Sequence, residues 1–459
     1  AEQPHMRRTQ SRESMSQRLS RVREAAKQRK KERFTALFHL LTAEALENAF
    51  LSLSRKAAAG VDGVRWKDYA ENLKVNIADL HRRLHQGSYR AQPGRRHYIP
   101  KADGKQRPLG IASLEDKIVQ YALVKILNAV YENDFMGFSY GFRPGRSQHN
   151  ALDALATGLV RTNVNWVLDA DISQFFDKVS HEWLIRFIEH RIGDQRVIRL
   201  IRKWLTAGTS EEGEWRASEE GTPQGAVISP LLANIYLHYV FDLWAHQWRR
   251  RHATGNVVMV RYADDIVIGF DKRIDAQCFR IAMQRRLKEF GLTVHPKKTR
   301  LMEFGRFAAE NRASRGKGKP ETFNFLGFTH ISGKDRSGRF MLIRKTRRDR
   351  MTATLKAIKD GLRKRWHYSI PEQGKWLRRV VQGYLNYHSV PGNYPMMRKF
   401  RIYVTDLWRR ALRRRSQQDD TTWTKANRLA AVWLPKVRVL HPWPVERFTA
   451  RHPRQEPGA

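Results

Sequence analysis

The stretch VRYADDIVIGF, Val260 to Phe270, places two adjacent carboxylates, Asp264 and Asp265, between two apolar runs. Runs rich in Val and Ile are typical of core strands, and a short polar interruption between two such runs predicts a hairpin turn. A carboxylate held against a core without a partner is costly unless a nearby positive charge compensates it. The stretch therefore predicts a hairpin whose tip needs a source of positive charge.

A second acidic strand lies upstream, in VNWVLDADISQFFDKVSH, Val164 to His181, which begins as a strand and passes into a helix near Ser180. Asp169 and Asp171 are two residues apart, so they share one face of that strand. If Asp171 meets the hairpin tip, three carboxylates could hold two Mg²⁺ ions about 4 Å apart. Such a pair of ions supports nucleotidyl transfer. The motif YxDD alone is weak, because aspartates in turns usually bond to the local backbone.

The global composition indicates a globular protein that binds a polyanion. The 459 residues, 41% of them hydrophobic, are enough for two or three domains with a large core. The chain has 86 Lys and Arg against 45 Asp and Glu, a formal net charge of +41. Such an excess is typical of proteins that neutralise phosphates, and we expect a nucleic-acid partner.

Several common classes of protein and site are disfavoured. No run of about 18 apolar residues predicts a membrane span, and the polar start lacks a secretion signal. The single cysteine, Cys278, excludes an internal disulfide and zinc sites built from cysteine pairs. We expect a soluble, cytoplasmic, nucleoid-associated protein without a membrane partner.

Basic residues are clustered. Residues 7–33 hold eleven basic and three acidic residues, which suits an arm that orders on a phosphate backbone, for example as a helix, with no certain fold of its own. The segment RKTRRDR, Arg344 to Arg350, opens a helical region with interleaved aromatics that either stack on bases or fill the helix core. The loop GFRPGRS, Gly141 to Ser147, adds two arginines.

Other elements follow from turn residues and periodicity. YIPKADGKQRPLGI, Tyr98 to Ile111, predicts a hairpin that turns at Asp103-Gly104. Helices are expected over 115–131 and after the turn at Pro223 and Gly225. Short strands are expected near 292–294 and 323–328, a loop over 306–320, and a proline-rich extended strap at the C-terminus.

Seven segments occur in the order of the conserved blocks of reverse transcriptases, and their wording resembles the bacterial group II intron-encoded reverse transcriptase/maturases. They are RPLGI, YGFRPGRS, DISQFFD, GTPQGAVISPLLANIYL, RYADDIVIGF, LTVHPKKT and FNFLGF, with AAAGVDGV upstream and HPWPVERF in the tail. The resemblance runs from about Leu51 to the C-terminus. It implies an α+β right-hand polymerase: fingers and palm on an antiparallel sheet, and an all-helical thumb.

The resemblance also implies domain boundaries. We expect a basic N-terminal arm over 1–40, fingers and palm over 41–335, a helical thumb or maturase domain over 336–420, and an extended tail over 421–459. Relatives with a His-Asn-His nuclease carry zinc-binding cysteine pairs, so second-strand cleavage by this chain is not expected.

Residue roles carry over from the same resemblance. The catalytic and metal-binding residues would be Asp171, Asp264 and Asp265, holding two Mg²⁺ ions. Asp169 is interpreted as a structural hydrogen bonder. The residues expected to bind the deoxynucleotide are Lys101, Arg107, Phe176, Gln224, Gly225 and Lys298, with Phe176 excluding a 2′ hydroxyl. The residues expected to bind nucleic acid are Arg143, Arg146, Arg344, Lys345, Arg347 and Arg348.

The implied function is an RNA-directed DNA polymerase and maturase that binds its group II intron RNA as a ribonucleoprotein, promotes splicing and copies the intron during retrohoming. Its partners would be the intron RNA, an RNA template, and a DNA primer or target. Two alternatives stay open: a domesticated reverse transcriptase in host defence or repair, and an RNA-binding splicing cofactor without polymerase activity. Basic clusters do not separate template binding from intron binding.

Overall fold

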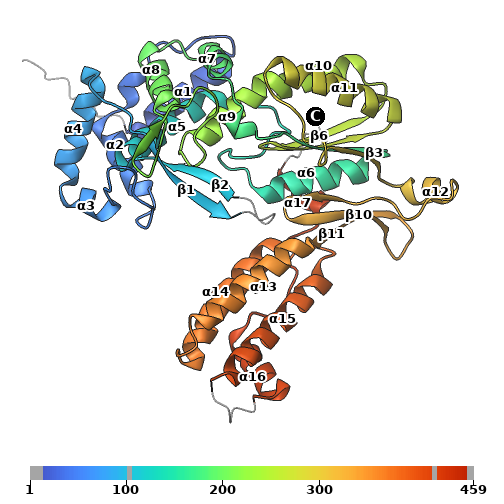
Figure 1. Ribbon diagram of the computed structural model, residues 1–459. Helices are drawn as coiled ribbons and strands as arrows, with labels where there is room; N and C mark the ends of the chain where they lie inside the picture. The colour runs from blue at the N-terminus through green and yellow to red at the C-terminus, as the bar shows by residue number, and fades with distance from the viewer. Residues whose placement is uncertain (1–13, 101–105, 416–420, 452–459) are drawn as a thin grey trace, which may run out of the picture. The chain divides into compact units, whose positions relative to one another are not determined.

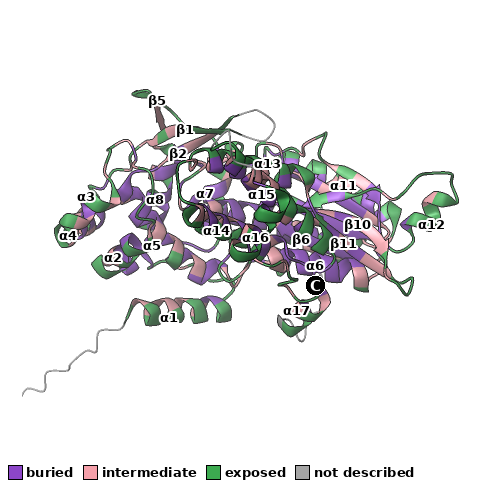
Figure 2. Ribbon diagram, turned by 90° about the horizontal axis from the view of Figure 1, so that it is seen from below, coloured by how far each residue is buried: buried purple, intermediate pink, exposed green. Residues whose placement is uncertain are grey.

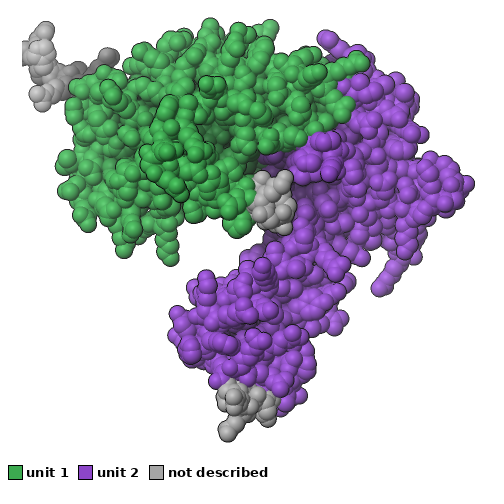
Figure 3. Space-filling view, viewed as in Figure 1, with its two compact units in different colours: residues 1–146, 172–248, 282–294 green, residues 147–171, 249–281, 295–459 purple. Residues whose placement is uncertain are grey.

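The computed structural model describes residues 14–100, 106–415 and 421–451. The chain divides into two compact units, drawn in two colours in Figure 3. The first comprises residues 1–146, 172–248 and 282–294, and the second comprises 147–171, 249–281 and 295–459. The chain thus crosses between the units several times, so neither unit is one continuous segment.

The first unit holds a small mixed sheet and a set of helices (Figure 1). Its strands are β1 (Gly94–Pro100), β2 (Gln106–Ile111), β4 (Thr209–Glu211) and β5 (Glu214–Arg216), in the order β2-β1-β4-β5. The β1 and β2 strands form the predicted antiparallel hairpin, but β1 and β4 are parallel. The helices are α1 (Met15–Gln28), α2 (Ala43–Ser52), α3 (Trp66–Glu71), α4 (Leu73–Gln86), α5 (Leu114–Tyr131), α7 (His181–Glu189), α8 (Gln195–Thr206) and α9 (Ser229–Leu237), with the short turns Phe38–Leu40, Phe175–Asp177 and His238–Asp242.

The described part of the N-terminal arm is a docked helix. A capping box between Ser14 and Gln17 begins α1, and Ala26 is fully buried. Arg191 donates to the backbone carbonyls of Ala26, Arg29 and Glu32, so one guanidinium group holds the end of the helix. Residues 15–28 are therefore helical, which is one of the expectations for this arm, and contacts with the protein hold the helix.

The second unit contains the predicted acidic sheet. Its strands are β3 (Trp166–Asp171), β6 (Val257–Tyr262), β7 (Asp265–Phe270) and β8 (Arg300–Glu303), in the order β6-β7-β3-β8. All three pairings are antiparallel, as the sequence predicts for the palm. Strands β6 and β7 are buried along most of their length, and β3 combines buried with half-buried residues; the view coloured by burial shows β6 as buried (Figure 2).

Helix α6 (Gln148–Arg161) covers one face of this sheet. Gly158 of α6 lies against Val258, and Gly269 of β7 lies against Val164 and Leu159, so small residues allow close packing. Because side chains alternate along a strand, Val267 and Asp265 share the face of Gly269. The sheet thus carries an apolar end beneath α6 and an acidic end where β7 begins.

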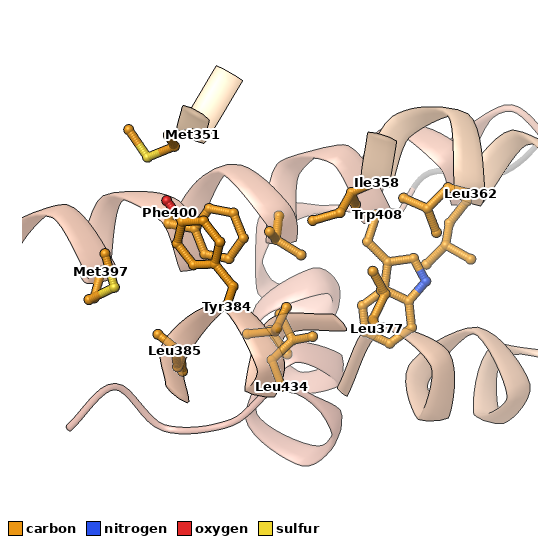
Figure 4. Packing of buried hydrophobic residues seen from close by; sticks show 14 residues of the cluster. Met351, Ile358, Leu362, Leu377, Tyr384, Leu385, Met397, Phe400, Trp408 and Leu434 are labelled. Carbon is orange, nitrogen blue, oxygen red and sulfur yellow. The ribbon is translucent and has the colours of Figure 1, made fainter. Parts of the chain in front are cut away.

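A second antiparallel sheet leads into a helical bundle. The sheet contains β9 (Phe323–Phe325), β10 (Phe328–Lys334) and β11 (Phe340–Thr346), and the bundle contains α13 (Arg348–Arg363), α14 (Ile370–His388), α15 (Tyr394–Arg413) and α16 (Trp423–Trp433). The bundle has its own core, in which Phe400 stacks on Tyr384 and the Trp408 indole donates to Gln373 (Figure 4). The predicted boundary at 335/336 falls inside the β10–β11 hairpin, and the helical bundle begins at α13.

The C-terminal tail is not a simple strap. Residues 423–433 form α16, and Pro444 begins α17 (Pro444–Arg451), where a proline costs no hydrogen bond. Arg447 of α17 bonds to Asp153 of α6 and to His441, whose other ring nitrogen bonds to the Asn386 carbonyl. An extended segment over 434–443 joins the two helices.

Two smaller expectations also need correction. The segment 306–320 contains the helix α12 (Ala308–Ala313). Val294 forms an isolated bridge with Ile172 and no strand. Helices α10 (Leu243–His252) and α11 (Arg273–Glu289) follow the long apolar face of α9 and the acidic hairpin. No helix in the described ranges is long and apolar enough to cross a bilayer.

Candidate active site

The hairpin β6–β7 presents its two carboxylates at a tight turn. Tyr262 pairs with Asp265, so the loop consists of Ala263 and Asp264 alone. Ala263 has φ 56°, a left-handed conformation that costs free energy for a residue with a Cβ atom. The fully buried Arg261 donates to the Ala263 carbonyl at 3.0 Å, which stabilises this backbone. Arg261 was not predicted as a functional residue, although a cation inside the apolar run VVMVRY is unusual.

The neighbouring strand brings the third carboxylate to the same place. Asp171, the last residue of β3, is the direct cross-strand partner of Asp265, and Asp169 is the partner of Val267. Paired residues on adjacent strands have Cβ atoms about 5 Å apart and point to the same face. Asp171, Asp265 and Asp169 therefore lie together at the acidic end of the sheet, next to Asp264.

Mutual repulsion and burial mark this cluster. Many protein atoms crowd the Asp265 carboxyl, although the residue keeps contact with solvent, and this desolvation raises its pKa to about 7. Repulsion by Asp264, Asp171 and Asp169 adds to the effect, and Lys298 opposes it. Burial likewise raises the pKa of Asp169 to about 6, against the attraction of Arg300. The Asp169 carboxylate accepts no hydrogen bond from the described residues, so its interpretation as a structural hydrogen bonder is not supported.

The donor set fits a hard divalent cation. Carboxylate oxygens are the ligands that Mg²⁺ prefers, and a dication would relieve the repulsion that raises the Asp265 pKa. Within the described ranges, however, no three Asp, Glu, His or Cys side chains already converge as they do around an ion. The residues suitable for a metal are adjacent, but their side chains are not arranged around one.

The side chain of Lys298 reaches the carboxylate cluster. Its ammonium group donates to an Asp171 carboxylate oxygen at 2.7 Å. The backbone beside it is tied to the sheet, since the amide of His295 donates to the Asp171 carbonyl and the amide of Lys298 donates to the His295 carbonyl. The residue expected to bind a nucleotide thus contacts a carboxylate of the cluster.

Comparison with known proteins identifies the family. Residues 99–330, half of the chain, match the family described as "Reverse transcriptase (RNA-dependent DNA polymerase)". The chain belongs to the reverse transcriptase family. The match confirms the α+β right-hand polymerase fold that the sequence predicts.

The relatives of this reverse transcriptase confirm the resemblance to group II intron proteins. It is 43% identical over 206 residues to "Protein YkfC" of Escherichia coli (strain K12), covering 44% of this chain and 54% of that protein. It is 37% identical over 223 residues to "Group II intron-encoded protein LtrA" of Lactococcus lactis subsp. cremoris, covering 48% and 37%. It is 26% identical over 393 residues to "Putative COX1/OXI3 intron 1 protein" of Saccharomyces cerevisiae (strain ATCC 204508 / S288c), covering 71% and 46%. The chain spans about half or less of the length of these relatives.

In this reverse transcriptase, most residues expected to bind the nucleotide lie in the first unit. Gly225 has φ 108°, and a Cβ there would lie 3.2 Å from the Gly110 carbonyl oxygen, so a glycine is required. The Gln224 side chain donates to Asp177, and its carbonyl accepts from Gly110. Phe176 is half-buried and edge-on to Phe175. Arg107 is exposed on β2, and Lys101 lies outside the described residues.

The six residues expected to bind nucleic acid divide into two groups. Arg143 is buried and its donors are satisfied by Glu132, Met136 and Ser139, while Arg344 is buried in an ion pair with Asp153. Neither guanidinium can reach a phosphate, so both are structural and the expectation is corrected.

The other four remain closer to solvent. Arg146 is half-buried and donates to the Gly137 and Ser139 carbonyls, and Arg347 pairs with Asp349. Lys345 and Arg348 are exposed and form no ion pair or side-chain hydrogen bond with the described residues. Lys345 and Arg348 are therefore the residues of this set best placed to contact a phosphate.

Metal affinity should rise with pH up to about pH 7 and then level off. The pKa of Asp265 is raised from 3.8 to about 7, so ionising it costs free energy in the folded protein, and the metal-free protein loses stability as the pH rises through this window. Below about pH 7, metal binding must release the Asp265 proton. Mn²⁺ titrations between about pH 5.5 and 8 check this. Asp265→Asn should weaken binding and remove most of the pH dependence; an unchanged profile would contradict the assignment.

Proposed function

We propose that this chain is an RNA-directed DNA polymerase that uses Mg²⁺ and deoxynucleoside triphosphates. The pairing of Asp171 with Asp265, beside Asp264 at the hairpin tip, is the observation that carries the proposal. It supplies three carboxylates at one open end of a sheet, from segments about ninety residues apart.

In the proposed reaction, the primer 3′ oxygen forms a bond to the α-phosphorus of the nucleotide, and the bond to the pyrophosphate breaks. When bound, Mg²⁺ would lower the pKa of the 3′ hydroxyl and neutralise the departing pyrophosphate. Asp171, Asp264 and Asp265 would hold the ions. Arg107, Gln224, Gly225 and Phe176 would bind the nucleotide, with Phe176 selecting deoxyribose. Lys101 is proposed for the same set from its sequence position alone.

Primer extension tests the polymerase. A DNA primer annealed to an RNA template, with Mg²⁺ and all four deoxynucleotides, should be extended to the template end. Ribonucleotides should be incorporated poorly. No extension by the folded wild-type protein would favour an RNA-binding cofactor instead.

We further propose that the chain acts as a maturase that binds group II intron RNA as a ribonucleoprotein, promotes splicing, and copies the intron into target DNA. The net charge of +41 and the group II intron relatives support this. A folded ribozyme in the DNA that flanks the reading frame is the expected genetic context. Splicing of that RNA by the protein at low Mg²⁺ would test the proposal, and flanking DNA without a ribozyme would remove it.

RNA affinity should depend steeply on salt, because each neutralised phosphate releases counterions. Each such phosphate contributes roughly −0.7 to −0.9 to the slope of the logarithm of the binding constant against the logarithm of the salt concentration. Lys345→Gln and Arg348→Gln should each reduce this slope by about one if both side chains contact phosphates. Filter binding at several KCl concentrations measures it. Lys334→Gln is the matched control, since Lys334 is exposed but pairs with Glu310 at 3.0 Å. Equal slopes for all variants would exclude these two residues from the interface.

A further inference from the structure

We infer that Lys298 is a displaceable counter-ion of the carboxylate cluster: in the metal-free protein its ammonium group neutralises Asp171, and a divalent cation must displace it to bind. This role differs from the nucleotide contact that the sequence resemblance implies for Lys298. It rests on the proposed function only in assigning a divalent cation to these carboxylates.

The contact is direct and lies on the atoms that a cation needs. The distance from the Lys298 Nζ to the Asp171 Oδ2 is 2.7 Å, within the range of a charge-assisted hydrogen bond. The Asp171 side chain is 20% exposed, so it keeps some access to solvent and to an ion from solution. The positive charge of the ammonium group at this oxygen repels a dication that approaches the same carboxylate, so the two cations compete for Asp171.

Backbone hydrogen bonds fix the main chain at Lys298, whereas its side chain is largely exposed. The turn 295–299 is closed by donation from Lys298 and Thr299 to the His295 carbonyl, and it is joined to β3 by the bond from His295 to the Asp171 carbonyl. Two residues later, Arg300 of β8 lies opposite Asp169 of β3 in the backbone register of the sheet. The side chain beyond this anchored backbone is 62% exposed. Lys298 is therefore held beside Asp171 but can swing into solvent without disturbing the fold.

The ammonium group of Lys298 neutralises part of the negative charge of the carboxylate cluster. Asp169, Asp171, Asp264 and Asp265 crowd the end of one sheet, and Lys298 is the cation that contacts Asp171 directly. Lys298 also acts on Asp265, where its positive charge opposes the repulsion from the other carboxylates. The pair thus lessens the repulsion within the metal-free cluster. A partly exposed ion pair is weak, so a dication held by several carboxylates displaces it readily.

Direct measurement of metal binding tests the inference without requiring catalysis. Mn²⁺ binding is followed by electron paramagnetic resonance on the full chain, without nucleic acid or nucleotide, at about pH 8, where Asp265 is ionised. Lys298→Met should bind Mn²⁺ roughly fivefold more tightly than the wild type, the factor expected for losing a weak competing pair. Lys298→Arg, which keeps a cation beside Asp171, should stay within about twofold of the wild type.

The adjacent lysine provides the matched control. Lys297 is exposed and forms no ion pair or side-chain hydrogen bond with the described residues, so Lys297→Met removes the same charge without removing the pair. We expect it to change the Mn²⁺ affinity by less than about twofold. In an Asp171→Asn background, Lys298→Met should lose most of its effect, because the pair is already broken.

Three results would overturn the inference: equal affinities of the Lys297→Met and Lys298→Met proteins, weaker binding by Lys298→Met, or no Mn²⁺ binding by either the wild type or Lys298→Met. The outcome is separable from that of the proposed function. If Lys298→Met tightens Mn²⁺ binding but the wild type fails to extend a primer, the counter-ion role stands and the polymerase proposal does not. If primers are extended but the two lysine variants bind Mn²⁺ equally, the reverse holds.

Discussion

Asp264→Asn is expected to lower the rate of primer extension by about a thousandfold, the factor that corresponds to losing about 4 kcal/mol of transition-state stabilisation from a bound metal ion. The amide keeps the shape of the side chain but carries no charge to hold a dication. Thermal unfolding of the metal-free variant should occur at the same or a slightly higher temperature, because Asp264 repels Asp265 in the wild type. Single-turnover extension on an RNA template measures the rate.

Glu310→Gln is the control for this substitution. Glu310 lies on α12 in the same unit, is exposed, and forms an exposed ion pair with Lys334. Removing its charge should leave the extension rate within about twofold of the wild type. Comparable losses in both variants would show that Asp264 acts through overall charge, and a fully active Asp264→Asn would remove this residue from the metal site.

The second large effect is expected at Asp153, which lies buried between two arginines. Asp153 and Arg344 are both 2% exposed and form an ion pair at 3.5 Å, and Arg447 of α17 bonds to the other carboxylate oxygen. Burial lowers the pKa of Arg344 to about 10, against the attraction of Asp153. Asp153→Asn leaves Arg344 charged and without a counter-ion in the interior. We expect a loss of about 3–5 kcal/mol in the free energy of unfolding, because breaking a buried pair strands its other charge.

Thermal and urea denaturation, both followed by circular dichroism, measure this loss. The midpoint of the affected transition should fall by roughly 10 °C. Asp349→Asn is the matched control, since Asp349 pairs with Arg347 in a contact that is 49% exposed on the aspartate side. It should cost less than about 1 kcal/mol. Similar small shifts for both variants would mean that the buried pair contributes no more than a surface pair.

The Asp153 cluster also gives the HPWPVERF segment a structural role. His441 and Arg447 of this segment bond to Asn386 and Asp153, and the His441 ring stacks on His149 at 4.0 Å. His149 and Asp153 belong to α6, whose first residue, Gln148, bonds to the hydroxyl of Tyr262 in the acidic hairpin. The tail therefore supports the helix on which the hairpin rests.

Much of the candidate site was predictable because its determinants are local. The apolar runs of β6 and β7, the polar interruption at Ala263-Asp264 and the two-residue spacing of Asp169 and Asp171 define a hairpin and an acidic strand without reference to the rest of the chain. The order of seven motifs then identified the family. The errors concern residues whose roles depend on distant partners: Arg143 and Arg344 read as phosphate ligands because a sequence shows their charge but not their burial.

The structures of the C-terminal tail and the N-terminal arm also depend on distant residues. The prolines at 435, 442 and 444 predict an extended strap, but a proline at the first position of a helix loses nothing, and α17 gains the contact of Arg447 with Asp153. The arm at 15–28 has little apolar periodicity, yet it is held by Arg191, more than one hundred and sixty residues away. Long-range hydrogen bonds determine the conformation of both segments, and such bonds cannot be predicted from local helix propensity.

The sequence by itself determined the strands, the carboxylates they carry and the family, because side-chain alternation and turn chemistry act between near neighbours. Only the tertiary structure decided which strand lies beside which, and hence that Asp171 faces Asp265 and that Lys298 reaches Asp171. Strand order and the position of a turn across a sheet are set by packing between segments far apart in the chain. Charge pairing at the site is therefore a property of the fold, although every charge in it can be read from the sequence.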